Sequence, residues 1–386
     1  QGLNGVKVLS TNKERAIAAL VMQGPQHRAA LARSLSVSRT TVTNLVQDLI
    51  AEGYMADDGE SPLKSTVKLT EKVGVLVSVV FWIDRTLISI ASVDGRLLNS
   101  REIAENPHES GKVRLSHVAA PLSVMRAQLG DPTVRAGHVA VNTQINVRTG
   151  EVVGSAASSM WKGTNPLKAM GALLDAPICV ENTARLAAFV EYERMGEPAS
   201  SMAYVHLSHG ITMGYVLDGA LIRGGHGGAG ELGHISIDPM GIPCECSNRG
   251  CLQQYVSTPA ILARLRPILG EKAGVSDFVD AVNNGDHACV SLVEEIGEQL
   301  GVAMVTVTNL LDPEEIVLGG ELAKVGAHLL EPLRRVVRRR GLPLSAHNVR
   351  FSCAGEPASA QEMAAAAFRV IVHDEEIVES IVRSVA

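Results

Sequence analysis

Four side chains that could bind a metal ion lie close together in the sequence. His234 is followed by Cys244, Cys246 and Cys251 in the pattern His-x9-Cys-x-Cys-x4-Cys. One imidazole and three thiols are a complete tetrahedral ligand set for zinc, and a zinc with every position taken by protein is structural. The spacing therefore predicts a structural zinc loop over residues 234–251. Three buried or disulfide-bonded cysteines in an irregular loop are the alternative.

The composition indicates a folded protein of more than one domain. The chain has 386 residues, of which 46% are hydrophobic and only 3% aromatic, so its cores are built from aliphatic side chains. The net charge of −6 excludes a protein coated in basic surface, but it is compatible with a local nucleic-acid patch. The few, clustered cysteines and the lack of a visible signal peptide indicate the cytoplasm. No uncharged apolar run of about 20 residues is present, so no membrane span is expected.

The first 72 residues have the pattern of a winged helix-turn-helix. The spacing of apolar and capping residues predicts three helices, over residues 12–24, 27–35 and 38–53. Two short strands around a polar turn follow over residues 54–70, as in a wing. The segment resembles the MarR-like winged helices that precede sugar-responsive repressors, and we expect it to form a DNA-binding domain over residues 1–72.

Short polar and basic side chains lie near the start of the third predicted helix, opposite its apolar face. Such side chains read base edges when a helix enters the major groove, and a lysine in the wing can contact phosphate. The candidate DNA-binding residues are Ser38, Arg39, Thr40, Thr43, Asn44 and Lys64. The segment carries nine Lys and Arg against seven Asp and Glu, so its charge supports DNA binding only weakly. A three-helix module for protein interaction or dimerisation is the alternative.

From residue 73 strands and helices alternate, which indicates an α/β fold with a mixed sheet. Strands are predicted over residues 73–84, 85–100, 101–106, 138–146 and 202–208, and helices over residues 113–129 and 184–194. Asp94-Gly95 is expected to make a hairpin turn, and residues 204–224 repeat the hairpin-rich start. Two such halves suggest the duplicated ribonuclease-H-like architecture of actin and hexokinase, here as two α/β lobes over residues 73–386.

Three stretches carry a resemblance to a known family. They are the run GGAGELGH before the cysteine loop, residues 177–191 (PICVENTARLAAFVE) and residues 309–323 (NLLDPEEIVLGGELA). Together with the cysteine pattern and a serine six residues after Cys251, they are similar to the signature of the ROK family of repressors, open reading frames and sugar kinases. The likeness covers nearly the whole chain. In that family a winged helix precedes the ROK domain in the repressors and is absent from the kinases.

Groups that the kinase members of the family need are missing. A glycine-rich phosphate turn would fall at residues 77–86, which contain no glycine, and a second phosphate loop at residues 208–212 keeps one glycine. The aspartate that acts as general base would fall at Thr183, whose neutral hydroxyl cannot accept the proton. Gly319 and Gly320 remain at the family's adenine site, where they also suit a tight strand-to-helix turn. We therefore predict that the chain is not an enzyme.

The sugar-binding residues of the family are partly retained. Glu231 and His234 match its hydroxyl-binding pair, and Asn182 also matches. Gln253 stands in place of a glutamate and Ser158 in place of an asparagine, so the ligand's hydroxyl pattern is expected to differ from that of glucose-like sugars. The resemblance implies that these five residues bind an effector between the two lobes. The alternative is that such polar side chains satisfy backbone groups of loops.

These patterns together predict a transcriptional regulator, in the first instance a repressor, that binds double-stranded operator DNA and responds to a sugar or sugar derivative. A homodimer or homotetramer is expected, with zinc as cofactor. A ROK sugar kinase with retained activity and a ligand-independent DNA-binding regulator are the alternatives. Five arginines between residues 334 and 340 are interpreted as a solvated helix face rather than a nucleic-acid contact. The tail over residues 374–386 predicts a short amphipathic helix, a candidate for packing across a dimer.

Overall fold

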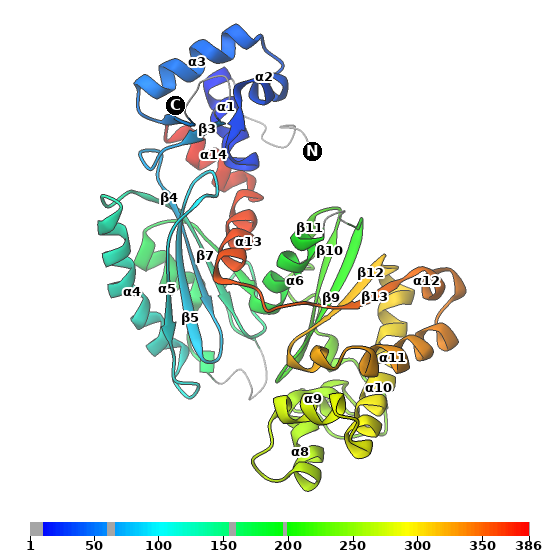
Figure 1. Cartoon of the computed structure of the whole chain (residues 1–386). Coiled ribbons are helices and arrows are strands. Elements are labelled where there is room, and N and C mark those ends of the chain that lie inside the picture. The colour runs from blue at the N-terminus through cyan, green and yellow to red at the C-terminus, as the bar shows by residue number, and fades with distance from the viewer. Residues whose placement is uncertain (1–10, 60–65, 154–159, 196–198, 386) are drawn as a thin grey trace. The chain divides into compact units, whose positions relative to one another are not determined.

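The structure is a computed structural model that describes residues 11–59, 66–153, 160–195 and 199–385 (Figure 1). Contacts within the chain divide it into two compact units. Unit 1 comprises residues 1–152, 158–183 and 359–386, and unit 2 comprises residues 153–157 and 184–358. The last segment of the chain, residues 359–386, therefore belongs to unit 1 again.

A winged helix-turn-helix begins unit 1. Its helices are α1 (Asn12–Gln23), α2 (Arg28–Leu35) and α3 (Arg39–Ala51), and its three-stranded sheet has the order β1 (Gln26–His27), β3 (Thr66–Leu69), β2 (Met55–Asp58). The Thr11 hydroxyl accepts a hydrogen bond from the Glu14 amide at the start of α1, and the Ser38 hydroxyl accepts one from the Thr41 amide at the start of α3. Ser36 ends α2 in the left-handed region, with φ of 57°, which makes the turn tight. The predicted helices and wing strands are confirmed, and the two-residue strand β1 adds to them.

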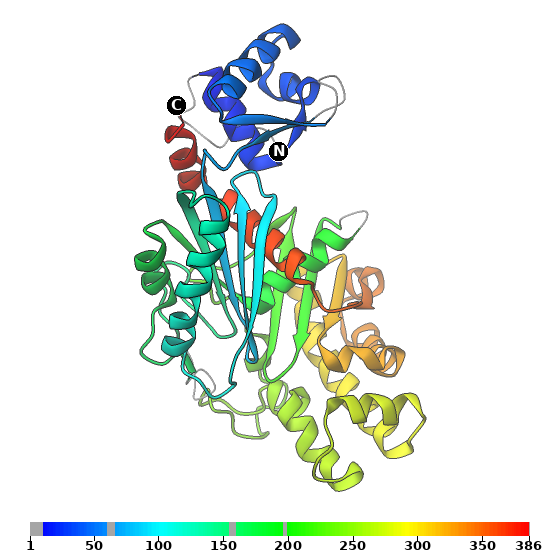
Figure 2. The ribbon, with the colours of Figure 1, turned by 60° about the vertical axis from the view of Figure 1, so that its left-hand side comes forward.

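The second sheet of unit 1 has five strands in the order β6, β5, β4, β7, β8. The strands are β4 (Val75–Phe81), β5 (Arg85–Ser92), β6 (Leu97–Ala104), β7 (Val134–Val141) and β8 (Ile178–Asn182). β6, β5 and β4 pair antiparallel, whereas β4, β7 and β8 pair parallel. Alternate residues of β4 face opposite sides: Val75, Val77 and Val79 pack with α4 (Gly111–Gln128) and α5 (Pro166–Leu174), and Leu76 packs with α13 (Ala360–Val372). Figures 1 and 2 accordingly show α13 on the face of this sheet opposite α4.

The predicted strand boundaries were wrong at the β5–β6 hairpin. Residues 85–100 were expected to form one strand, but β5 ends at Ser92 and residues 97–100 belong to β6. The predicted turn at Asp94-Gly95 is confirmed, since Gly95 adopts a φ of 86° there and its amide donates to the Ser92 carbonyl. The chain therefore reverses in the middle of the predicted strand.

Unit 2 repeats the topology of the five-stranded sheet. Its strands are β9 (Ser201–Leu207), β10 (Ile211–Leu217), β11 (Ala220–Leu221), β12 (Glu315–Gly319) and β13 (Arg350–Cys353), in the order β11, β10, β9, β12, β13. The first three pair antiparallel and the last two join in parallel, as in unit 1. Its helices are α6 (Thr183–Arg194, whose first residue belongs to unit 1), α7 (Gln253–Val256), α8 (Thr258–Leu269), α9 (Val275–Asn283), α10 (His287–Leu311), α11 (Ala327–Arg340) and α12 (Pro343–Asn348), with single 3₁₀ turns η3 (Leu232–His234) and η4 (Glu321–Val325). Two sheets of the same strand order confirm the predicted duplication.

The last helix of the chain packs inside unit 1. α14 (Glu375–Arg383) is amphipathic, as predicted, and buries Ile377, Val378, Ile381 and Val382. These side chains share one hydrophobic core with α1, α3 and the start of β4. The apolar face of α14 is therefore covered by its own chain, so the suggestion that it packs across a dimer was wrong. Residues on both sides of position 72 belong to this core, and the domain boundary there stays a prediction.

Among the described residues, no helix is both long enough and apolar enough to cross a membrane.

Candidate functional site

A glycine-rich turn in unit 2 positions the candidate effector residue Glu231. The turn runs along β10, where the Met213 amide donates to the Gly230 carbonyl at 2.7 Å. Gly230 has a φ of +91°, and a Cβ added there would lie 1.8 Å from the Met213 carbonyl oxygen. Arg185 of α6 is fully buried and donates from Nη1 to the Gly227 carbonyl at 2.6 Å and to the Ala229 carbonyl at 3.2 Å. Hydrogen bonds to the backbone of the turn thus hold it from two sides.

The electrostatics of Glu231 follow from this position. Burial raises the pKa of its carboxyl above the ordinary value, and Arg185 and His234 act in the opposite direction. Glu231 also lines a pocket of about 300 Å³ whose other walls are mainly apolar side chains of β10 and α10. A mostly apolar pocket with a few polar groups is the common form of a small-molecule site.

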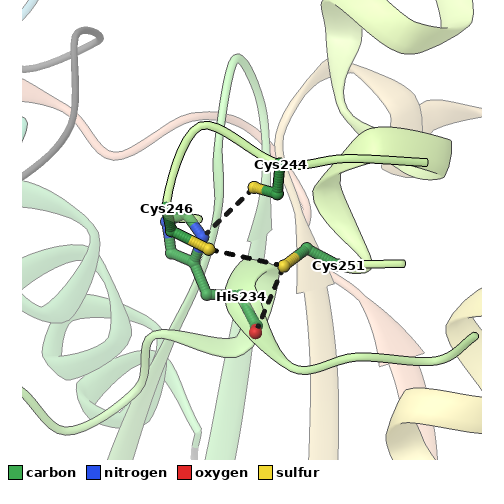
Figure 3. A group of neighbouring side chains, drawn as sticks. All are labelled: His234, Cys244, Cys246 and Cys251. Atoms are coloured by element: carbon green, nitrogen blue, oxygen red, sulfur yellow. Dashed lines mark hydrogen bonds between the residues drawn. The ribbon is translucent and has the colours of Figure 1, made fainter. Parts of the chain in front are cut away.

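The four predicted metal ligands come together at one point, as Figure 3 shows. His234 Nδ1 lies 3.7 Å from Cys244 Sγ, and Cys246 Sγ lies 3.6 Å from Cys251 Sγ. All four ligand atoms lie within 4.8 Å of one another. Bonds of about 2.3 Å to sulfur and about 2.0 Å to nitrogen give ligand–ligand distances of roughly 3.5–3.8 Å in a tetrahedral zinc site. The donor set and its spacing therefore fit a zinc ion.

The cysteines are free thiols, which argues against the disulfide alternative. Cys244, Cys246 and Cys251 form no disulfide, and the 3.6 Å between the sulfurs of Cys246 and Cys251 exceeds the roughly 2.05 Å of a disulfide. Burial raises the pKa of Cys244, but hydrogen bonds from Cys246 and His234 outweigh it and lower that pKa to about 7. Burial and its neighbours raise the pKa of the Cys251 thiol to about 12. Cys244 is therefore converted to the metal-binding thiolate more readily than Cys251.

Two features of the cysteine loop's backbone hold this cluster in shape. Gly250 has a φ of +64°, and a Cβ there would lie 1.6 Å from the Asp238 carbonyl oxygen. The Gly250 carbonyl accepts a hydrogen bond from the Ile237 amide at 2.8 Å. Cys244 donates its amide to the Asn248 carbonyl at 2.8 Å, which closes the tip of the loop. The close approach of backbone to backbone explains why glycine stands directly before Cys251.

Gln253 contacts the cluster from the start of α7. Its side-chain amide donates to Cys244 Sγ at 3.7 Å and to Glu245 Oε1 at 3.4 Å. Gln254, which the sequence did not single out, also donates to Cys244 Sγ, at 3.4 Å. Hydrogen bonds from neighbouring side chains to a metal ligand orient that ligand and tune its charge. Of the predicted effector residues, Glu231, His234 and Gln253 thus lie together in unit 2.

The remaining predicted effector residues lie elsewhere in the chain. Asn182 ends β8 in unit 1, where it is buried and donates its side-chain amide to the Thr143 carbonyl at 2.9 Å. This bond is of the kind that the backbone-satisfying alternative describes. Ser158 lies outside the described residues. The effector roles of all five residues stay predictions.

The predicted DNA-reading face of α3 is open to solvent. Arg39, Thr40 and Asn44 are exposed, and Thr43 is half-buried with its hydroxyl donating to the Arg39 carbonyl at 2.9 Å. Ser38 is exposed, but its hydroxyl is engaged as the cap of α3. Lys64 lies outside the described residues. In the described part of the wing, Asp58 pairs with Lys68 at 2.9 Å.

The place of the first phosphate turn, between β4 and β5, is closed by packing. At the β4–β5 turn the Trp82 amide donates to the Arg85 carbonyl, and buried Arg114 donates to the carbonyls of Trp82 and Ile83 at 2.6 Å each. A turn whose carbonyls meet a guanidinium offers no ring of amides to a phosphate. Gly319, the last residue of β12, and Gly320 after it are explained by sterics, because a Cβ would lie 2.0 Å from the Tyr204 hydroxyl at Gly319 and 2.1 Å from the Leu207 carbonyl oxygen at Gly320.

The chain joins a winged helix-turn-helix to a duplicated sheet. It keeps the cysteine loop but not the glycine-rich phosphate loops. These features define a regulator built on a sugar-kinase fold. The chain belongs to the ROK family, whose model matches residues 84–368.

Known proteins similar to this chain include both repressors and kinases. The xylose repressor of Caldicellulosiruptor bescii is 24% identical, over 84% of this chain and 86% of the repressor. A glucokinase of Halalkalibacterium halodurans is 33% identical, but over only 46% of this chain. Among solved structures, a ROK family transcriptional regulator homologous to the E. coli MLC protein covers 97% of this chain with a TM-score of 0.76 and 22% identity. The ROK hexokinase of Thermus thermophilus covers 76%, with a TM-score of 0.61 and 23% identity.

Gly230→Ala should destabilise the protein by about 2 kcal/mol or more, because the added methyl group meets the Met213 carbonyl and the positive φ disfavours alanine. Gly225→Ala is the matched control, since Gly225 belongs to the same turn and a Cβ there would have no neighbour within 4 Å. Denaturant unfolding of both variants measures the difference. Equal midpoints would show that the close approach of the turn to β10 is not a constraint.

Proposed function

We propose that this chain is a DNA-binding transcriptional regulator, acting as a repressor, whose affinity for operator DNA is set by a sugar or sugar derivative. The observation that carries the proposal is the combination of an exposed recognition face on α3 with a ROK domain that has lost its phosphoryl-transfer groups. Two recognition helices of a homodimer, or of a pair of dimers, would enter successive major grooves of a partly palindromic site. The relatives that align along most of this chain are named as repressors, which supports the same assignment.

The kinase alternative is not favoured by the residues. The place of the general base is taken by Thr183, and Arg114 occupies the carbonyls of the turn that would hold phosphate. The kinase relatives also lack a counterpart for part of the chain, since the Thermus thermophilus hexokinase covers 76% of it, whereas the regulator structure covers 97%. Phosphorylation of a hexose by the purified protein, unaffected by Thr183→Val, would contradict the proposal.

DNA binding should depend on the start of α3. DNA selected from a random duplex library with the full chain provides the probe. Arg39→Ala should weaken its binding by about 1–3 kcal/mol, roughly tenfold to a hundredfold, because the exposed guanidinium is placed to contact the major groove. Arg338→Ala, in the exposed basic run of α11, is the control and should leave binding unchanged. Electrophoretic mobility shift at fixed salt measures both. A larger loss with Arg338→Ala would move the nucleic-acid contact to α11.

The effector is proposed to bind at the wall formed by Glu231, His234 and Gln253. Glu231 is half-buried beside a mainly apolar pocket, so it can accept hydrogen bonds from ligand hydroxyls where water competes weakly. Differential affinity for the DNA-bound and free forms would then convert sugar binding into a change of operator affinity.

Calorimetry against a panel of pentoses, hexoses and their N-acetyl derivatives should find saturable binding. Glu231→Ala should abolish it, since the carboxylate is the hydroxyl acceptor at this wall. Glu298→Ala, which removes an exposed carboxylate on α10, should leave it unchanged. A panel without any binder would favour the ligand-independent regulator instead.

A structural zinc is proposed at His234, Cys244, Cys246 and Cys251. With four protein ligands, the ion would take no part in a reaction. It would instead hold the loop closed and so fix Gln253 in the effector wall. The side chains hold it directly, and Gln253 and Gln254 contact Cys244.

Metal analysis of the purified protein should give about one zinc per chain. Cys246→Ser should lose the ion, because a serine hydroxyl is a poor ligand for zinc. Cys353→Ser should retain it, since Cys353 is a half-buried cysteine outside the cluster. A stable protein without metal would contradict the zinc site while leaving the DNA-binding proposal intact.

A further inference from the structure

The last residue of the wing is held by side chains of the β5–β6 turn. β3 ends at Leu69, whose amide donates to Asp94 Oδ2 at 2.8 Å and whose carbonyl accepts from Arg96 Nη2 at 2.6 Å. Arg96 Nε also donates to Asp94 Oδ1 at 3.1 Å. Both backbone groups of Leu69 are therefore bound by one ion pair from the neighbouring sheet. We call Asp94, Arg96 and Leu69 the junction clamp.

The carboxylate of the junction clamp, which belongs to Asp94, is buried. Asp94 is only 3% exposed, and the Ser92 hydroxyl donates to it as well. A buried carboxylate is costly unless donors surround it, and here a backbone amide, a hydroxyl and a guanidinium do so. Removing one partner leaves the others without a hydrogen bond, which costs free energy because they are buried. The clamp is therefore held in one geometry.

The residues that follow Leu69 are tied to the end of the recognition helix. The Thr70 hydroxyl donates to the Gly53 carbonyl at 2.6 Å, and Lys72 Nζ donates to the Glu52 carbonyl at 2.7 Å. Lys72 also lies over the Tyr54 ring, 4.7 Å from its centroid. Glu52 and Gly53 directly follow α3. A continuous chain of contacts thus runs from the β5–β6 turn to the C-terminal end of α3.

Apolar packing supports the same joint. Val73, Leu76 and Val93 around the clamp are fully buried in the core that also contains α1 and α14. The segment between the wing and β4 is thus packed and hydrogen-bonded, unlike a flexible linker.

We propose that Asp94 and Arg96 are positioning residues for DNA recognition. They fix the direction of α3 relative to the five-stranded sheet of unit 1, so that the distance between two recognition helices is set by the body of the protein and not by a mobile tether. The inference rests on the proposed DNA-binding function. A rigid joint also transmits a displacement of the five-stranded sheet to α3.

The test compares DNA with one and with two half-sites, taken from the selected sequence. Arg96→Met keeps the aliphatic stem but removes both hydrogen bonds, and Asp94→Asn keeps one acceptor for the Leu69 amide. Arg101→Ala, which removes an exposed arginine from the adjoining strand β6, is the matched control. Both clamp variants should bind a single half-site within about twofold of the parent, because the reading face is untouched.

Binding to two half-sites should fall by about tenfold, and the preference for one spacing should flatten, because a loose joint lowers the effective concentration of the second module. The Arg101→Ala control should keep both. Two-site affinity and spacing preference equal to the parent would overturn the inference. An equal loss on one and two half-sites would also overturn it, since that result indicates local unfolding of the reading face.

Hydrogen exchange separates failure of this inference from failure of the proposed function. In Asp94→Ala, without any DNA, the Leu69 amide should exchange about tenfold faster than in the parent, while amides of β9 in unit 2 stay unchanged. Unchanged exchange at Leu69 would overturn the clamp even if the protein binds DNA. Faster exchange in a chain that binds no selected DNA would support the clamp and contradict the proposed function.

Discussion

One hydrophobic core joins the two ends of the chain, and the organisation of unit 1 depends on it. Helices α1 and α3 of the winged helix-turn-helix share this core with α13 and α14, which come from the last residues of the sequence. A domain of about 60 residues on its own buries a smaller fraction of its surface than a larger domain does and is marginally stable. Burying its apolar side chains against the five-stranded sheet and α14 offsets this weakness. The same packing gives the recognition helix a defined direction, which a separately folded domain on a tether would lack.

In unit 2 the corresponding constraint is the close approach of the glycine-rich turn to β10. Gly230 permits the contact, and Arg185 holds the carbonyls of the turn from α6. The turn leads directly into η3, so the placement of Glu231 and of His234 follows from one backbone path. The proposed zinc loop and the proposed effector wall therefore depend on the same turn. Either one would be displaced if the turn moved.

The turn of unit 1 that corresponds to the phosphate-binding turn of the kinases is held by different contacts. Its carbonyls are taken up by Arg114, and the bulky Phe81 packs edge-on against Trp161 at 5.1 Å between ring centroids. Apolar and cationic side chains there stabilise the sheet where a kinase would need bare amides. Loss of phosphoryl transfer and gain of packing thus occur at the same residues. The ligand-binding half of an enzyme can remain in use as a sensor after its chemistry is lost.

The sequence by itself determined the local features of this protein. Capping residues placed the first and third helices of the winged helix-turn-helix, and a histidine with three cysteines at fixed spacing predicted a cluster that the fold brings within 4.8 Å. Ligand type and short-range spacing are enough for such features, because the partners lie within a few turns of the chain. Only the tertiary structure decided the partner of α14, the grip of Arg185 on the glycine turn and the junction clamp. These contacts join residues far apart in sequence through side-chain directions and packed surfaces, and periodicity within a segment carries no information about which distant segment will cover it.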